Sequence, residues 1–271
     1  MLSKSKTTLT CTSNERYVPP LCAFLNSIQI NQPDVQIVVR LVNCTNKTID
    51  KIKSNFGDIN VIIDNHELSD NRNITNLSEV EGKTIEQLRG ARSGFKGVRW
   101  LYSQEAAYCS NIKYQTIHEL LNKGIEFIVH MDVDTIVRHR FDCLRDAMLG
   151  YDIGMYICPE EHMKQLTEYG HKYMGWHAGI IVVNNTDTSR TFIDRVRNRV
   201  RENIYDIEAD EDEFDYVYNN TDDINILSVD KTYKDNGPVF NVNSHIWSGQ
   251  SEAKSENRQY INEYEKYKIA I

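Results

Sequence analysis

The sequence predicts an α/β fold in which a mostly parallel central sheet carries helices on both faces. Short apolar segments rich in β-branched residues alternate along the chain with segments whose apolar residues recur at helical spacing. Such alternation is typical of parallel sheets covered by helices. Several of the apolar segments are hydrophobic throughout, as expected of strands that are buried on both faces. A length of 271 residues fits one domain of this class, and we expect a single domain over residues 1–271.

The first third of the chain contains three predicted strands. "TTLTCT" at residues 7–12, "VQIVVRLV" at 35–42 and "INVIID" at 59–64 are short, apolar and β-branched. A helix is expected after the first strand, because Pro19 and Pro20 suit a helix N-terminus and apolar residues then recur at helical spacing from Leu21. This part therefore predicts alternating strands and helices.

A polar segment from Asn65 to about Gly97, rich in Asn, Ser and Gly, predicts a long loop or lid. A helix over residues 111–124 and a strand over 125–137 follow. Further strands are expected at 152–159 and 178–185, a helix at 188–203, and a helical tail from Glu252.

Composition excludes several classes of function. A formal net charge of −8 argues against a nucleic-acid-binding surface, which needs a basic face. No stretch approaches the roughly 18 apolar residues of a membrane span, and the first residues lack the apolar core of a secretory signal. The six cysteines are scattered without the spacing of zinc ligands. We therefore expect a cytoplasmic protein with no nucleic-acid partner and no transmembrane segment.

The segment "MDVDT" places Asp132 and Asp134 at the carboxyl end of a predicted strand. In open α/β sheets ligands bind beyond this end of the strands, and two carboxylates there suit a divalent cation. Such a cation, Mn²⁺ or Mg²⁺, could neutralise a departing diphosphate as a Lewis acid. His245 is the predicted third ligand, because a neutral imidazole joins carboxylates around such cations. By itself the Asp-x-Asp pattern also occurs as a turn cap.

The opening "TCTSNERY", followed much later by "MDVDT", resembles the glycogenin-type, family 8 glycosyltransferases, which have the GT-A fold with its Rossmann-like sheet. The resemblance extends over about residues 7–254. It implies a nucleotide-binding part at about 7–135 and a sugar- and acceptor-binding part at about 136–255. By this resemblance Tyr17 would stack on uracil, and the nucleotide would also be contacted by Cys11, Thr12, Ser13, Asn14 and Val133.

The resemblance also implies residues around the diphosphate and the sugar. Lys113 matches the family lysine that reaches the donor, and Gly179 matches a family glycine, whereas His177 stands where an Asn is expected. The family's Asp-Gln pair corresponds to Asp212 and Glu213, which would lie at the reacting carbon. The C-terminal family motif is matched only by His245 and Gly249, with no Lys-Pro-Trp. Positive charge for the diphosphate would come from Lys113, Arg92, Lys96 and Lys254.

The implied activity is metal-dependent transfer of a sugar from a UDP-sugar to a hydroxyl group of a glycan or protein, with retention of anomeric configuration. An inverting enzyme is the first alternative, and acidic residues that could act as its base are Glu160, Glu161, Asp212 and Asp215. A haloacid-dehalogenase-type phosphatase would use Asp132 as nucleophile, but about 130 residues precede this motif, which normally follows a first strand. A non-catalytic sugar-nucleotide-binding protein is the third alternative, and a homodimer is left open.

Overall fold

The structure is a computed structural model, and it describes residues 2–3, 6–67, 104–157, 175–206, 209–235, 241–248 and 258–269. The predicted lid at 65–97 lies mostly outside these residues. The predicted strand at 152–159 and the predicted helical tail are described in part.

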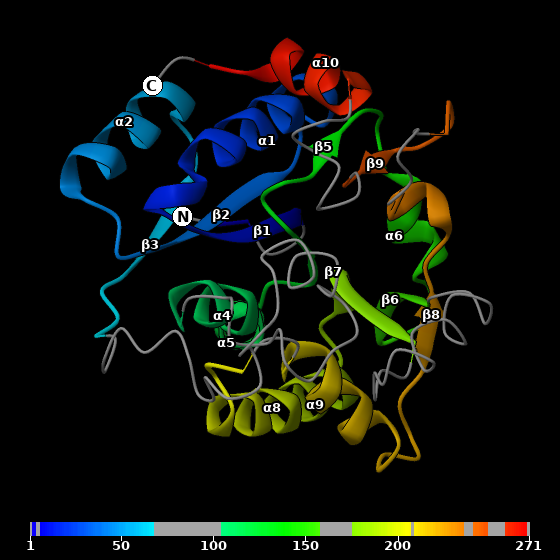
Figure 1. Cartoon of the computed structure of the whole chain (residues 1–271). Coiled ribbons are helices and arrows are strands. Elements are labelled where there is room, and N and C mark those ends of the chain that lie inside the picture. The colour runs from blue at the N-terminus through cyan, green and yellow to red at the C-terminus, as the bar shows by residue number, and fades with distance from the viewer. Residues whose placement is uncertain are drawn as a thin grey trace, which may run out of the picture.

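A seven-stranded sheet forms the centre of the protein, with strand order β3-β2-β1-β4-β7-β6-β8 (Figure 1). Among the described strands of this sheet, β7 alone runs against the others: it pairs antiparallel with both β4 and β6. The remaining neighbours pair in parallel. The predicted mostly parallel α/β sheet is therefore confirmed. Its strands are β1 (Thr7–Asn14), β2 (Gln36–Val42), β3 (Asn60–Asp64), β4 (Phe127–Met131), β6 (Ile153–Ile157), β7 (Trp176–Asn184) and β8 (Ile226–Ser228).

A separate antiparallel ribbon pairs β5 (Ile136–Val137) with β9 (Ile246–Trp247). β5 follows the "MDVDT" segment directly, so this ribbon brings the chain around residue 246 close to the end of β4. Trp247 is fully buried in the ribbon and packs against Tyr260 with ring centroids 5.3 Å apart.

Helices cover both faces of the sheet, as predicted (Figure 1). On one face lie α1 (Val18–Asn31), α2 (Asn46–Phe56) and α10 (Arg258–Tyr267). On the other face lie α4 (Gln104–Asn111), α5 (Lys113–Asn122), α8 (Asp187–Glu202) and α9 (Ala209–Tyr218). Short helical turns complete the described elements: η1 (Glu15–Tyr17), α6 (Cys143–Ala147) and η4 (Lys231–Tyr233).

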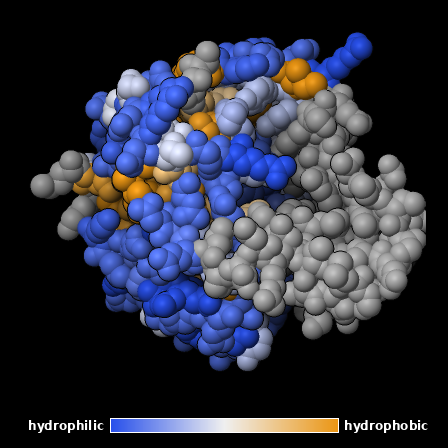
Figure 2. Space-filling model, turned by 60° about the vertical axis from the view of Figure 1, so that its left-hand side comes forward, coloured by the Kyte–Doolittle hydropathy of each residue, from blue (hydrophilic) through white to orange (hydrophobic). Residues whose placement is uncertain are grey.

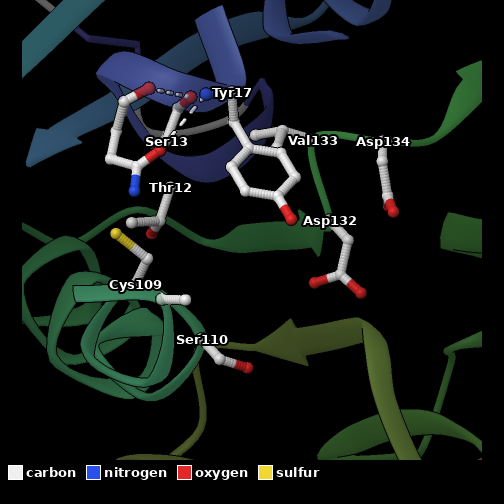
Figure 3. A pocket seen from close by; sticks show the side chains of 10 residues that line it. Thr12, Ser13, Tyr17, Cys109, Ser110, Asp132, Val133 and Asp134 are labelled. Atoms are coloured by element: carbon white, nitrogen blue, oxygen red, sulfur yellow. Dashed lines mark hydrogen bonds between the residues drawn. The ribbon is translucent and has the colours of Figure 1, made fainter. Parts of the chain in front are cut away.

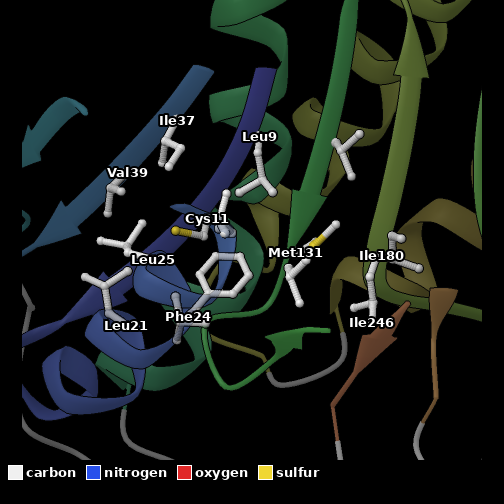
Figure 4. Close-up of a cluster of buried hydrophobic side chains, with 14 of the residues drawn as sticks. Leu9, Cys11, Leu21, Phe24, Leu25, Ile37, Val39, Met131, Ile180 and Ile246 are labelled. Carbon is white, nitrogen blue, oxygen red and sulfur yellow. The ribbon is translucent and has the colours of Figure 1, made fainter. Parts of the chain in front are cut away.

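Two hydrophobic clusters, one on each face, hold the layers together. In the first, Leu21, Phe24 and Leu25 of α1 pack on Leu9 and Cys11 of β1 (Figure 4). The second cluster joins α5, α8 and α9 to the opposite face of the sheet, through side chains such as Val38 of β2, Ile128 of β4 and Ile181 of β7. Because successive strand residues point to opposite faces, strands that are apolar throughout supply both clusters.

Helix boundaries follow local capping chemistry. The helix expected at 188–203 begins at Asp187, because the Thr186 hydroxyl accepts the Ser189 N–H and the Ser189 hydroxyl accepts the Thr186 N–H, which is a reciprocal capping box. The helix expected at 111–124 is α5, and it begins at Lys113 after a break from α4.

Hydrophilic residues predominate on the described surface that Figure 2 shows, in keeping with a charged fraction of 26%. Within the described ranges, no helix combines the length and the hydropathy that crossing a bilayer requires.

Candidate active site

A cavity of about 200 Å³ opens where β1 and β4 end (Figure 3). Carboxyl ends of adjacent parallel strands meet at one edge of the sheet, which is where open α/β sheets bind ligands. Three segments supply its walls: the end of β1 with η1, the turn after β4, and helix α4. The lining residues are Thr12, Ser13, Asn14, Tyr17, Ala106, Cys109, Ser110, Asp132, Val133 and Asp134.

The β1 wall contains the predicted nucleoside residues. The Asn14 side-chain oxygen accepts the Tyr17 backbone N–H at 3.2 Å, which fixes the tight turn after β1. Tyr17 is 39% exposed and its ring projects into the cavity from this side, while Cys109 and Ser110 face it from α4 (Figure 3). Thr12, Ser13, Asn14 and Tyr17 all line the cavity, whereas Cys11 is fully buried in the hydrophobic cluster against α1.

Asp132 and Asp134 form the opposite wall. The Asp132 N–H donates to the Gly179 carbonyl at 3.3 Å, and the Tyr260 hydroxyl donates to the Asp134 carbonyl at 2.8 Å, so the turn that carries both carboxylates is held by β7 and α10. The Asp132 side chain is 40% exposed. Burial raises the pKa of this carboxyl, but the ammonium groups of Lys113 and Lys234 outweigh it and hold the pKa below its ordinary value. Asp132 is therefore an anion at neutral pH.

Lys113 is buried behind Asp132. Its ammonium donates to Asp210 Oδ2 at 2.7 Å and to the Ala178 carbonyl at 3.1 Å, and it lies 3.7 Å from Asp132 Oδ1. Burial lowers the pKa of Lys113, but the Asp210 and Asp132 carboxylates raise it overall, so the lysine remains charged. The sequence resemblance gives Lys113 a contact with the donor, and in the structure this lysine lies beside the first aspartate of the Asp-x-Asp motif.

Asp210 is fixed from several sides. Its backbone N–H donates to the Asn111 side chain at 3.0 Å, the Tyr114 hydroxyl donates to its carbonyl at 3.0 Å, and the Ser110 hydroxyl donates to its carboxylate at 3.2 Å. α9 thereby docks its first turn against α4, the helix that lines the cavity.

A second buried lysine, Lys234, also lies close to Asp132. It follows η4, is 3% exposed, and its ammonium donates to the Ser248 hydroxyl at 3.0 Å. An added Cβ at Gly179 would lie 2.1 Å from Lys234 Nζ and 2.9 Å from Asp132 Oδ2. The ammonium and the carboxylate therefore border the same small space, which exists because residue 179 is glycine.

His177 and Glu211 meet beside the start of β7. Glu211 Oε1 accepts the Ala178 N–H at 2.9 Å and lies 3.4 Å from His177 Nδ1. That same Nδ1 accepts the Gly179 N–H at 3.1 Å. The carboxylate that contacts this strand is thus two residues before the predicted Glu213.

Other predicted residues lie away from the cavity lining. Glu213 pairs with Arg199 at 2.5 Å and accepts the Asn203 side chain at 2.8 Å, facing α8. Asp212 is partly exposed on α9.

His245 stacks on Tyr233 with ring centroids 4.9 Å apart, and its Nδ1 meets the Arg140 carbonyl. Predicted residues outside the described part of the chain are Arg92, Lys96, Glu160, Glu161, Gly249 and Lys254.

Within the described residues, no group of three or more His, Cys, Asp or Glu side chains is arranged to hold a metal ion. The two aspartates share the cavity wall, and the structure does not bring His245 into that wall. Two carboxylates with open positions remain a suitable donor set for a hard cation that binds together with an anionic ligand.

Several residues of the site were missed by the sequence reasoning. Cys109 and Ser110 lie on α4, within the stretch between the predicted lid and the predicted helix. Asp210 stands in the acidic run "EADEDEFD", where Glu213 and Asp215 are buried as well, so the sequence pattern alone did not indicate which acid meets Lys113. No pattern in the sequence around Lys234 indicated that this lysine lies near Asp132.

Comparison with known proteins gives similarity in structure alone. No protein-family model matches the chain, and no curated protein matches it in sequence. The structure is similar to the glycosyltransferase GlyE of Streptococcus pneumoniae, with a TM-score of 0.60 and 10% identity over 99% of this chain and 61% of that one. This chain thus spans about three fifths of GlyE.

It is also similar to the galactosyltransferase LgtC, solved in complex with donor and acceptor sugar analogues, with a TM-score of 0.58 and 13% identity over 97% of both chains. The bifunctional glycosyltransferase WbbM matches with a TM-score of 0.52 and 11% identity over all of this chain and 53% of that one. At these identities the likeness concerns the fold, and the chain has the GT-A fold that these glycosyltransferases share.

Proposed function

We propose that this protein is a metal-dependent glycosyltransferase that transfers a sugar from a UDP-sugar to a hydroxyl group of a glycan or protein. The observation that carries the proposal is the cavity at the ends of β1 and β4, where Asp132 and Asp134 face the β1 turn at Tyr17 within a GT-A fold. A nucleotide diphosphate needs an aromatic or polar surface for its base and charge compensation for its phosphates, and this cavity offers both.

The β1 wall suits a nucleoside. Tyr17 is partly exposed, and its backbone is fixed by Asn14, so the ring can stack on a base without much loss of side-chain freedom. Polar groups of Ser13 and Ser110 stand on either side of the same cavity and could meet the ribose. The resemblance to glycogenin-type enzymes favours uracil as that base.

Asp132 and Asp134 are the residues that would hold a Mn²⁺ or Mg²⁺ ion, and oxygen donors are what these hard cations prefer. When bound, such an ion neutralises the diphosphate as the sugar bond breaks. His245 remains the proposed third ligand. Because a carbonyl can only accept, its contact with Arg140 requires a proton on Nδ1, which leaves the lone pair of Nε2 for a metal.

Protein side chains, in addition to the metal ion, would orient the reacting sugar. The buried Lys113–Asp210 pair fixes the first turn of α9, and Glu211 then contacts the β7 backbone next to His177. We therefore place the sugar-facing acid at Glu211, because Glu213 is engaged with Arg199 and Asp210 is engaged with Lys113. Retention of configuration is proposed from the family resemblance.

The test is ligand binding and turnover of the Asp134→Asn variant. UDP with Mn²⁺ should raise the melting temperature of the wild type, since a ligand at 100 times its Kd adds about 2.7 kcal/mol of stability. Asp134→Asn should lose this shift and the release of UDP from donor, while Asp146→Asn, on an exposed residue of α6, should keep both. Full turnover by Asp134→Asn would refute the role of the motif.

The same assay separates the alternatives. Release of inorganic phosphate rather than UDP would indicate a phosphatase. Binding of UDP without transfer or hydrolysis across a panel of donors would indicate a non-catalytic sugar-nucleotide-binding protein.

A further inference from the structure

Asp134 lies beyond the end of the strand that precedes it. The backbone turns at residues 133–134, between the end of β4 and the start of β5. Asp132 is tied to the central sheet, because its N–H donates to the carbonyl of Gly179 in β7. The Asp134 carbonyl is met from another direction, by helix α10. The two carboxylates of the cavity wall are therefore supported by different parts of the fold.

Tyr260, in the first turn of α10, makes two contacts at this point. Its hydroxyl donates to the Asp134 carbonyl at 2.8 Å, across 126 residues of chain. Its ring packs edge to face on Trp247 of β9, with centroids 5.3 Å apart and 63° between the ring planes. Tyr260 is 7% exposed, and Trp247 is fully buried. One buried side chain thus joins the Asp134 turn to β9, the partner strand of β5.

The other end of α10 is anchored on α1. The Tyr267 carbonyl accepts the Asn26 side chain at 2.9 Å, and the Tyr267 hydroxyl accepts the Asn31 side chain at 3.0 Å. Both asparagines belong to α1, beside which α10 lies in Figure 1. Because α1 packs on the central sheet, α10 connects the Asp134 turn to the hydrophobic core.

We propose that Tyr260 is a positioning residue for the metal site: its hydroxyl fixes the backbone of Asp134, and with it the carboxylate that would bind the ion together with Asp132. This inference rests on the proposed function. A metal ligand must be held in place by its surroundings, and loss of an outer partner of a ligand costs about 10- to 100-fold in metal affinity. Tyr260 is not among the residues that line the cavity, so it acts through Asp134.

A purely structural role for Tyr260 would be to dock α10 on the protein. Loss of its hydroxyl lowers stability under either role, because a buried hydrogen bond is removed. The two roles differ in what happens to the metal. If Tyr260 only docks the helix, a folded variant without the hydroxyl needs as much Mn²⁺ as the wild type does. If Tyr260 positions Asp134, that variant needs more Mn²⁺ to bind UDP, while its affinity for the nucleoside is unchanged.

The experiment compares the wild type with Tyr260→Phe and with a matched control, Tyr267→Phe. Each substitution removes one hydroxyl of α10 and keeps the ring, but the Tyr260 hydroxyl contacts Asp134 and the Tyr267 hydroxyl contacts Asn31. Isothermal titration calorimetry of UDP at a series of Mn²⁺ concentrations gives the concentration at which binding is half-maximal. Uridine affinity is measured without metal, and thermal unfolding without ligand reports the stability of each variant.

We expect Tyr260→Phe to raise the half-maximal Mn²⁺ concentration about tenfold. Its uridine affinity should change less than about twofold, because the nucleoside would contact the β1 wall, which this substitution does not touch. Tyr267→Phe should match the wild type in both measurements.

The inference is overturned if Tyr260→Phe needs no more Mn²⁺ than Tyr267→Phe, or if it loses as much affinity for uridine as for UDP with Mn²⁺. A wild type that binds UDP equally well without Mn²⁺ would refute the proposed metal dependence, and the inference with it.

Discussion

The buried ion pair between Lys113 and Asp210 allows a quantitative test of how the site is built. Side-chain exposures of 3% and 6% and a distance of 2.7 Å make it a desolvated pair in the described chain. Asp210→Asn removes the charge of one partner with little change in shape. It leaves a buried ammonium with the Ala178 carbonyl and, at 3.7 Å, the partly exposed Asp132.

The expected loss of stability follows from this arrangement. Removing one partner of a buried pair costs about 3–5 kcal/mol, because the other charge remains without compensation. Since Asp132 compensates in part, we expect about 3 kcal/mol, the lower end of that range. Glu126→Gln is the control: it breaks an exposed pair with Arg145 at 3.5 Å, with exposures of 56% and 42%, for which about 0–1 kcal/mol is expected.

The measurement is urea unfolding at pH 7 of the wild type and both variants. A loss below 1 kcal/mol for Asp210→Asn, equal to that of the control, would refute the reasoning that this pair is desolvated and tightly coupled. A double variant, Lys113→Met with Asp210→Leu, removes both charges and should recover most of the stability. If it does so and still fails to bind UDP with Mn²⁺, the pair serves the ligand as well as the fold.

Three further predictions concern single residues. Burial raises the pKa of Cys22 to about 12, so its thiol should resist Ellman's reagent in the native protein at pH 8, whereas the exposed Cys143 should react quickly and Cys143→Ser should remove that phase. The Thr48 hydroxyl holds the pKa of Glu15 below its ordinary value of 4.5, so this stabilisation is complete above that pH and is lost as the pH falls; Glu15→Gln should therefore flatten the acid limb of a stability–pH curve. Tyr17→Ala should weaken uridine binding about tenfold while Tyr17→Phe has little effect, because stacking needs the ring and not the hydroxyl.

The sheet could be predicted because its signals are local. Segments such as residues 35–42 are short and rich in β-branched residues, and helices such as α1 begin where the prolines indicate. The reversed direction of β7 could not be read from its sequence, since an apolar strand looks the same in either direction. Direction is set by the path of the chain from β6, part of which lies outside the described residues.

The residues of the site that lie at the ends of β1 and β4 could be predicted for a geometric reason. Tyr17 lies in the turn after the first predicted strand and Asp132 lies near the carboxyl end of the strand predicted at 125–137, and the ends of neighbouring parallel strands must meet. Tyr17 and Asp132 come together because β1 and β4 are neighbours in the sheet. Residues that arrive from the ends of helices or from loops have no such constraint, so Lys234 could be identified only once its segment was seen beside Gly179.

In the acidic run at the start of α9, packing determines which carboxylate lies at the site, because the composition of the run does not identify it. In "EADEDEFD" an Asp-Glu pair occurs both at Asp210 and at Asp212, and the sequence resemblance alone does not distinguish them. Burial of Asp210 and Phe214, four residues apart, sets the face of the helix that meets the sheet, and Asp212 is turned away from it. Lys113 then has a carboxylate within hydrogen-bond distance at Asp210. The helix face that carries Asp210, and not Asp212, should therefore serve the chemistry. This conclusion would be wrong if, after correction for stability, Asp212→Asn impaired turnover more than Asp210→Asn or Glu211→Gln.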